Sequence, residues 1–263
     1  MDSAYSKLSR AQGHLVALRS DIHAYRNRDP INFTYRQRND PLNGANIIVE
    51  YIAKVDEEPP ASWGLMVGDI LTNLRAALDH ALFGHIASRY TLTDDEAQGI
   101  QFPVREESGK WERWANRHSK WVEPSVSDAI GAMQPFNSVD PTDHLLWVLN
   151  RLVNYDKHRT LHVVAYRGEA TFDKHSASIR GLSSRSRQLT HNAVIATMTV
   201  LRPLPAPGQR PEVSRLMFEG EAGFSEHIDI PGRGPTRLGV LRLMEVLTEG
   251  VEEMLADLRS AGC

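Results

Sequence analysis

An arginine, an aspartate and a histidine lie close together in the run NLRAALDH, residues 73–80. On a helix, Arg75 and Asp79 are neighbours one turn apart, and His80 lies about 140° round from Arg75 on the rim of the same polar arc. A guanidinium binds phosphate through two hydrogen bonds, and an imidazole transfers a proton near neutral pH. We therefore take Arg75, Asp79 and His80 as candidate catalytic residues and Asn73 as a candidate binding residue. The alternative is a solvent-exposed face with an intrahelical ion pair.

A second polar cluster follows in the run NRLVNYDKHR, residues 150–159. Asp156 falls among the apolar residues of a predicted helix, and a buried carboxylate needs a cation or several donors. Arg75 and Arg159 are the expected cations. One hypothesis joins this cluster to the NLRAALDH face in one site. The other treats Asp156 as a structural carboxylate that satisfies an arginine or backbone amides. The candidate binding residues of the cluster are Arg151, Asn154, Asp156, Lys157, His158 and Arg159.

The segment Arg75-Ala-Ala-Leu-Asp-His80 resembles the Arg-x4-His motif of the HEPN superfamily. The resemblance covers residues 63–90 and the neighbouring helices. It implies a helical, commonly dimeric protein in which Arg75 and His80 act at a helix–helix interface on the phosphate and 2′-hydroxyl of RNA. One cation would stabilise charge at phosphorus while the imidazole moves a proton, without a metal ion. The implied function is a metal-independent ribonuclease or RNA-binding protein that forms a homodimer through its helices.

An arginine followed by a histidine after four to six intervening residues also occurs elsewhere in the chain. The NLRAALDH match is preferred because it lies on a long predicted helix with both residues in the polar arc. The match in the second cluster comes next, since residues seven apart nearly coincide on one helical face. The other matches are Arg113/His118, Arg151/His158 and Arg185/His191.

The run WERWANRHSKW, residues 111–121, places three tryptophans among arginine, histidine and lysine. Such a segment can stack on and pair with single-stranded nucleic acid. It can also be an amphipathic helix that packs its tryptophans onto the core, and we favour this second interpretation.

Composition narrows the classes of protein and of partner. The net charge is −3, so no bulk field draws the chain to nucleic acid or to an anionic membrane, and any RNA contact depends on a local basic patch. Cys263 is the one cysteine, which excludes an intramolecular disulfide and a cysteine-rich metal cluster. His158 and His162 have metal-ligand spacing, but no third ligand is fixed by the pattern. With no apolar run of about 20 residues and no signal-like start, we expect a cytoplasmic protein without metal or cofactor.

A long N-terminal helix is predicted over residues 3–28, because apolar residues repeat every seven positions along two lines. This seam needs a partner helix, either within the chain or across a dimer. Asp29-Pro30 ends the helix. The seam consists of Leu8, Leu15, Ile22, Ala11, Leu18 and Tyr25.

The remaining elements alternate in blocks of strands and helices. A hairpin is predicted at 31–37 and 45–55, a central helix at 63–89 with Ser62 as N-cap, and short helices near 108–118 and 125–133. A helix at 144–159, capped by Asp143, precedes the strand-like runs LHVVAYRG, SASIRG, NAVIATMTVLRP, SRLMFEG and EHIDIP. A C-terminal helix covers about 236–259. The pattern predicts a single α+β domain, 1–263, in which a helical core packs with an antiparallel sheet.

Three functional interpretations follow from the sequence. The first is the HEPN-type ribonuclease or RNA-binding protein. The second is a non-enzymatic interaction protein, antitoxin-like or regulatory, in which the polar helix face is structural and the N-terminal seam mediates assembly. The third is a small-ligand-binding protein or another enzyme with its pocket between sheet and helices.

Overall fold

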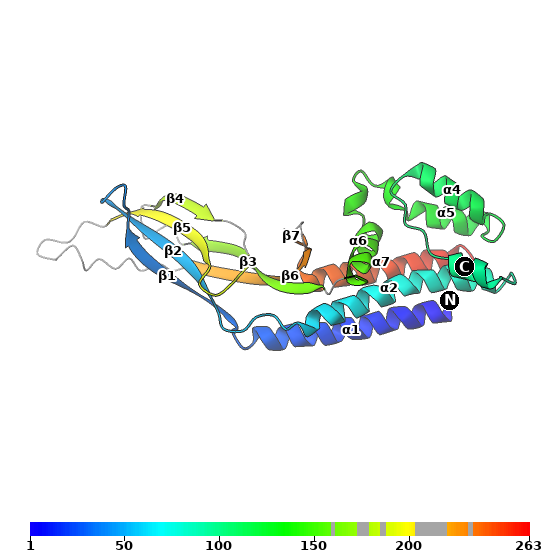
Figure 1. Cartoon of the computed structure of the whole chain (residues 1–263), viewed down its shortest axis with the longest axis horizontal. Helices are drawn as coiled ribbons and strands as arrows, with labels where there is room; N and C mark the ends of the chain where they lie inside the picture. The colour runs from blue at the N-terminus through cyan, green and yellow to red at the C-terminus, as the bar shows by residue number, and fades with distance from the viewer. Residues whose placement is uncertain (159–160, 173–178, 185–187, 203–219, 231–233) are drawn as a thin grey trace, which may run out of the picture. The chain divides into compact units, whose positions relative to one another are not determined.

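The computed structural model describes residues 1–158, 161–172, 179–184, 188–202, 220–230 and 234–263 (Figure 1). It confirms the α+β class. The described contacts divide the chain into two compact units. The helical unit comprises Met1–Ile22, Ala61–His162 and Ile230–Cys263, and the sheet unit comprises His23–Pro60 and Val163–Asp229. The single domain over 1–263 stays a prediction.

Helix α1, Asp2–Arg26, carries the predicted apolar seam. In the helical unit, α1, α2 and α7 lie side by side (Figure 1). The guanidinium of Arg19 pairs with Glu245 of α7 at 2.8 Å. The seam is therefore covered by helices of the same chain, and it does not offer a second copy an open surface. Its predicted members in this unit are at most 6% exposed: Leu8, Ala11, Leu15, Leu18 and Ile22.

Helix α2, Ser62–Ala87, is the centre of the helical unit, and its predicted apolar side is buried. Ser62 is the first helical residue and Ala61 the N-cap, with no side-chain capping bond, so the predicted Ser62 cap is wrong. The backbone N–H of Gly64 already donates to the carbonyl of Ala61, which starts the first turn one residue earlier than expected. Helix α7, Val240–Ser260, packs beside α2 and begins four residues later than predicted.

Short helices and two 3-10 turns follow α2 along the chain in this unit. Helices α4, Ser108–His118, and α5, Pro124–Ala132, lie close to their predicted positions. The predicted loop at 91–103 contains an additional helix, α3, Asp94–Gly99, which begins with a capping box formed by Thr93 and Glu96. The 3-10 turns are η1, Pro135–Asn137, and η2, Pro141–Asp143.

Helix α6, Leu145–Asp156, is shorter than the predicted 144–159. Its N-cap is His144, whose ring Nδ1 accepts from the backbone N–H of Leu146 at 3.2 Å. The predicted Asp143 cap is therefore wrong, because Asp143 instead receives hydrogen bonds from Arg237. Since α6 ends at Asp156, the out-of-pattern carboxylate lies in its last turn.

The sheet unit contains a four-stranded antiparallel sheet in the order β1-β2-β5-β4. Strands β1, Ile31–Asn39, and β2, Asn46–Val55, form the predicted hairpin. Strand β5, Val194–Leu201, pairs with both β2 and β4, Ile179–Ser184. Tyr51, Ala53, Ile195 and Ala196 are among the residues of its apolar core.

A second sheet has the order β3-β6-β7, with β3 His162–Phe172, β6 Gly220–Ile230 and β7 Gly234–Pro235. The predicted run SRLMFEG, 214–220, lies outside the described residues except for its glycine. Among the described helices, none combines the length and the apolar composition needed to cross a membrane.

Candidate anion-binding site

The side chains of Arg75 and Asp79 clamp the backbone of Phe102, which belongs to the extended segment after α3. The N–H of Phe102 donates to Asp79 Oδ1 at 2.8 Å, and Arg75 Nη2 donates to the Phe102 carbonyl at 2.5 Å. Arg75 Nη2 also donates to Asp79 Oδ1 at 3.1 Å. The predicted i,i+4 pair is therefore present, and it fixes a backbone segment to α2.

Gln134 holds the same segment from the other end. Its buried side chain accepts from the backbone N–H of Arg105 at 2.9 Å and donates to the carbonyl of Pro103 at 3.1 Å. Residues 102–105 are thus tied both to α2 and to the turn after α5. This fixed segment carries Arg105 toward Arg75 and α4.

A hollow of about 250 Å³ lies where α2, the fixed segment, α4 and α6 meet. Arg75, Arg105 and Arg117 all line it, and no carboxylate is among the described residues that do so. Only 13% of the Arg75 side chain is exposed, and its buried Nη1 has no hydrogen-bond partner within the described chain. The full lining is Arg75, Gly99, Gln101, Phe102, Pro103, Val104, Arg105, Trp114, Arg117, His118 and Asn150.

The arginines of this hollow repel one another. Burial lowers the pKa of Arg105, and the neighbouring positive charges of Arg75 and Arg117 lower it further. Arg105 Nη1 donates to the carbonyl of Val104 at 3.1 Å, which is a neutral acceptor and does not offset the charge. Since like charges close together are unfavourable, a bound anion would stabilise this arrangement.

His118 is the imidazole of the hollow. Its ring is buried and stacks on Trp114 with ring centroids 4.4 Å apart. Burial lowers its pKa, nearby Arg117 and Arg105 lower it further, and the hydrogen bond to the Trp114 carbonyl only partly opposes this, so the neutral ring is favoured. Because Nδ1 lies 2.8 Å from the Trp114 carbonyl, an acceptor, the proton belongs on Nδ1 and the lone pair on Nε2.

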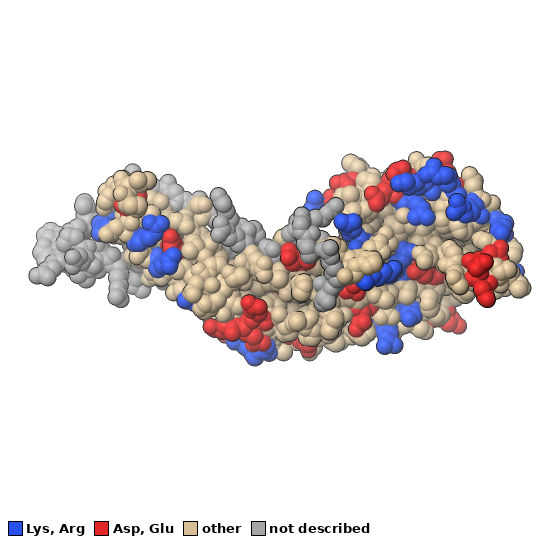
Figure 2. Space-filling view, in the orientation of Figure 1, with Lys and Arg blue, Asp and Glu red and all other residues tan. Residues whose placement is uncertain are grey.

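A second hollow of about 440 Å³ adjoins the first, and the two share Val104, Arg105, Trp114 and Arg117. Its lining adds Lys110 and Arg113 from α4, together with Glu106. We call the 250 Å³ space the inner hollow and the 440 Å³ space the outer hollow. In Figure 2, lysine and arginine atoms gather on the part of the surface where Figure 1 draws α4. The chain thus has the local basic patch that its overall charge does not provide.

His80 is not part of this site. Its Nδ1 lies 2.7 Å from the hydroxyl of Ser3 in α1, whereas Arg75 contacts the segment at Phe102. Asn73 is buried, and its amide donates to the carbonyl of Asp69 at 2.8 Å. The structure therefore brings Arg75 and Asp79 together and places His80 and Asn73 among other neighbours.

Of the second predicted cluster, only Asn150 lines the inner hollow, and its candidate binding residues are not among the described lining. The Asp156 carboxylate lies against α2 at Gly68, where a Cβ on the glycine would come within 2.6 Å of Oδ2. Burial raises the pKa of Asp156, and the charge of Asp69 raises it further. Arg75 donates to Asp79 and Phe102, so the expected Arg75–Asp156 contact is not among those of the described residues. Arg151, Asn154, Lys157 and His158 are exposed, and Arg159 lies outside the described residues.

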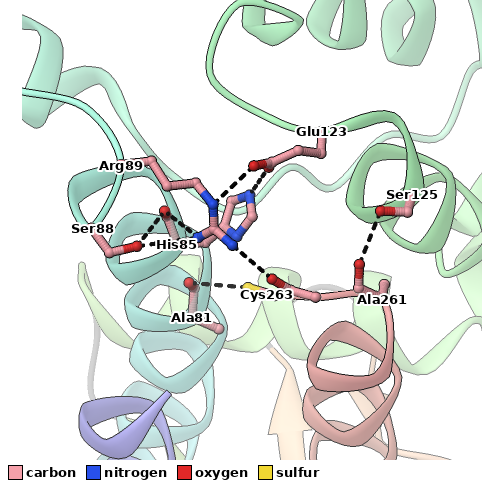
Figure 3. A network of polar contacts seen from close by, with 9 residues as sticks. Ala81, His85, Ser88, Arg89, Glu123, Ser125, Ala261 and Cys263 are labelled. Carbon is pink, nitrogen blue, oxygen red and sulfur yellow. Dashed lines mark hydrogen bonds and ion pairs between the residues drawn. The ribbon is translucent and has the colours of Figure 1, made fainter.

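A third polar cluster joins α2, α5 and the end of α7 (Figure 3). Glu123 contacts the buried ring of His85 and pairs with Arg89 at 2.8 Å. Arg89 also donates to the carbonyl of Gly262 at 3.0 Å, and Ser125 donates to that of Ala261 at 2.9 Å. These contacts satisfy the exposed ends of helices, so we assign the cluster a structural role.

Sequence reasoning missed Arg105, Arg117 and His118 as members of one site with Arg75. Two signals were available: the run WERWANRHSKW contains the last two, and Arg113/His118 is one of the arginine–histidine matches. The pattern of this run favours an amphipathic helix that packs its tryptophans onto the core. Trp114 supports this interpretation, because it is only 7% exposed. The cations of the same helix line the two hollows.

The described residues contain no group of three or more potential metal ligands. No family model, no curated protein and no solved structure matches this chain. The class of protein therefore has to be argued from the fold and from the site alone.

Proposed function

We propose that this chain binds single-stranded RNA, with phosphate groups held in the two hollows beside α4. One observation carries the proposal: Arg75, Arg105 and Arg117 line one small hollow without a carboxylate among its described lining residues. Guanidinium groups recognise phosphate through paired hydrogen bonds, and clustered cations supply most of the affinity for nucleic acid. The Trp114 ring, shared by both hollows, is stacked between Trp111 and His118, with ring centroids 5.2 and 4.4 Å away, and it forms a rigid wall beside the arginines.

The HEPN-type activity is retained in a modified form. The arginine of the predicted pair remains Arg75, but the imidazole that lines the same hollow is His118. In this proposal neither His80 nor Asp79 contacts the phosphate, and of the 150–159 cluster only Asn150 lines the inner hollow. Ribonuclease action without a metal stays a proposal, as do a cytoplasmic location and a homodimer formed through helices other than the buried α1 seam.

RNA binding is tested with a fluorescently labelled ten-nucleotide RNA and purified full-length chain at several salt concentrations. We expect affinity to fall steeply with salt, because each neutralised phosphate releases counterions. Arg117→Gln removes an exposed charge from the wall shared by the two hollows and should weaken binding. Arg10→Gln, an exposed arginine on α1, is the matched control and should not. RNA that fails to bind even at low salt would overturn the proposal.

Cleavage is tested on the same RNA in the presence of a metal chelator. If His118→Gln abolishes cleavage while His80→Gln does not, the inner hollow is the reaction site. If only His80→Gln abolishes it, the predicted pair acts elsewhere on α2. If the RNA stays intact in all samples, the chain binds RNA but has no nuclease activity.

A further inference from the structure

We infer that the inner hollow recognises the terminal phosphate monoester of an RNA strand, with the strand continuing into the outer hollow. End recognition of this kind rests on the proposed RNA binding and does not require cleavage. Which phosphate enters which hollow follows from the distribution of charge over the two linings.

The inner hollow has more positive charge than an internal phosphodiester can neutralise. A diester has one negative charge, whereas a terminal phosphate has a charge of about −1.5 to −2 at pH 7. Three guanidinium groups, from Arg75, Arg105 and Arg117, line the inner hollow. Asp79 pairs with Arg75 at 3.1 Å and offsets one of these three charges. The charge that remains on the hollow is still more than one phosphodiester neutralises, so a doubly charged group removes more of the mutual repulsion than a singly charged one.

The guanidinium of Arg75 is held in place and has a donor without an acceptor, which are two properties that favour anion binding. Its Nη2 is held by Asp79 and by the Phe102 carbonyl, so it has little freedom to swing toward solvent. Its Nη1 is buried without a hydrogen-bond partner in the described chain, and a buried donor left in this way is unfavourable. Since Arg75 lines the inner hollow, an anion bound there that contacts Nη1 would supply the missing acceptor.

Among the described lining residues, further cations are found on only one side of the inner hollow, the side that borders the outer hollow. The shared wall at Arg105 and Arg117 leads into the outer hollow, where Lys110 and Arg113 add two cations and Glu106 adds one carboxylate. Because the outer hollow is larger and Glu106 offsets part of its charge, its positive charge is less concentrated, which suits singly charged phosphodiesters. The rest of the described inner lining is neutral, for example Gln101. A strand passing straight through would place its next phosphate among these neutral residues. A strand that ends in the inner hollow avoids this.

The test compares RNAs of one ten-nucleotide sequence with a 5′-phosphate, with a 3′-phosphate, or with hydroxyl groups at both ends. We expect one phosphorylated form to bind about tenfold more tightly than the hydroxyl form. The better of the two identifies the end that is recognised. Arg117→Gln should reduce this preference, and Arg113→Gln, in the outer hollow, should weaken all three RNAs by a similar factor.

The outcomes separate end recognition from the proposed function. Equal affinity for all three RNAs, together with steep salt dependence, would overturn end recognition and leave RNA binding in place. End recognition is also wrong if Arg117→Gln weakens all three RNAs equally. If no RNA binds, the proposed function itself fails. Because Arg75 also fastens the Phe102 segment, Arg117 is the safer position for the variant.

Discussion

The carboxylate of Asp79 accepts a hydrogen bond from the backbone N–H of Phe102 at 2.8 Å. Since Arg75 donates both to Asp79 and to the Phe102 carbonyl, the three residues form a closed polar ring. This ring joins the central helix to the segment that carries Arg105. The placement of two arginines of the inner hollow therefore depends on one carboxylate.

Replacing Asp79 with alanine should weaken both folding and RNA binding. The Phe102 N–H loses its acceptor, which we expect to lower the free energy of unfolding by about 1–3 kcal/mol. Asp79→Asn keeps an oxygen acceptor and should retain more of both properties. Urea unfolding and RNA titration measure the effects. If Asp79→Ala leaves RNA affinity unchanged in folded protein, the ring does not position the inner hollow.

Phosphate should change the titration of His118. In the free protein, burial and the neighbouring Arg117 and Arg105 lower its pKa below the usual value of about 6.5. A bound anion offsets the arginine charges, so saturating inorganic phosphate should raise this pKa. Nuclear magnetic resonance of the histidine rings provides the measurement. The exposed ring of His158, which borders neither hollow, is the control for general effects of phosphate. If the pKa of His118 is the same with and without phosphate, no anion binds in the inner hollow.

Two glycines of α2 should respond oppositely to alanine. Gly84 has open space around an added Cβ, so Gly84→Ala should stabilise the protein by about 0.5–1 kcal/mol through backbone entropy and helix propensity. At Gly68 the added Cβ would come within 2.6 Å of the Asp156 carboxylate, which must move. Gly68→Ala should therefore be less stable than Gly84→Ala in urea unfolding. If both variants are stabilised equally, the Asp156 side chain at the end of α6 moves away from position 68 without a cost in stability.

Acid should destabilise the chain before its carboxylates titrate. Burial lowers the pKa of His85, His118 and His144 in the folded state. At acidic pH the unfolded chain therefore binds more protons than the folded chain. The stabilisation is present above the unfolded-state pKa of about 6.5, and it is lost as the pH falls through the lowered pKa values of the folded-state histidines. Urea midpoints should be lower at pH 5.5 than at 7.5. His144→Asn, which keeps a capping side chain, should reduce that difference.

The ion pair between the half-exposed Arg26 and the buried Glu226 in the sheet unit is a separate test of stability. Glu226 is 1% exposed and receives hydrogen bonds from Arg26. Arg26→Met leaves the carboxylate buried without its cation, and we expect a loss of about 3 kcal/mol. The double variant Arg26→Met with Glu226→Met should recover most of it, because an apolar pair needs no counter-charge. A double variant as unstable as the single one would contradict this account.

The helices of this fold were predictable because the burial of one helical face follows from local spacing. The repeat of Leu8, Leu15 and Ile22 predicted a buried seam, and each of the three is at most 6% exposed. Whether the covering helix belonged to the same chain was not encoded in that spacing. The covering of the α1 seam depends on α7, which lies more than 200 residues further along the chain.

The candidate site was predictable only in its helical half. The pair Arg75 and Asp79 follows from i,i+4 geometry, but its partner is the backbone of Phe102, 27 residues from Arg75 in an irregular segment. Likewise, the partner of His80 is Ser3, 77 residues away. Contacts with irregular backbone leave no periodic signal, so the grouping of Arg75 with Arg105 and Arg117 needed the structure.

The division of the helical unit into three separate stretches of chain has a consequence during synthesis. Helices α1 and α2 leave the ribosome before the sheet-unit residues 163–229, and α7 follows them. At about 5–20 residues per second, the apolar side of α2 waits about 8–30 seconds after the synthesis of Ala87 until α7 begins at Val240. During that interval it is a target for chaperones and for misassociation. Slower translation of residues 163–229 would lengthen the interval and lower the yield of folded protein without changing any native contact.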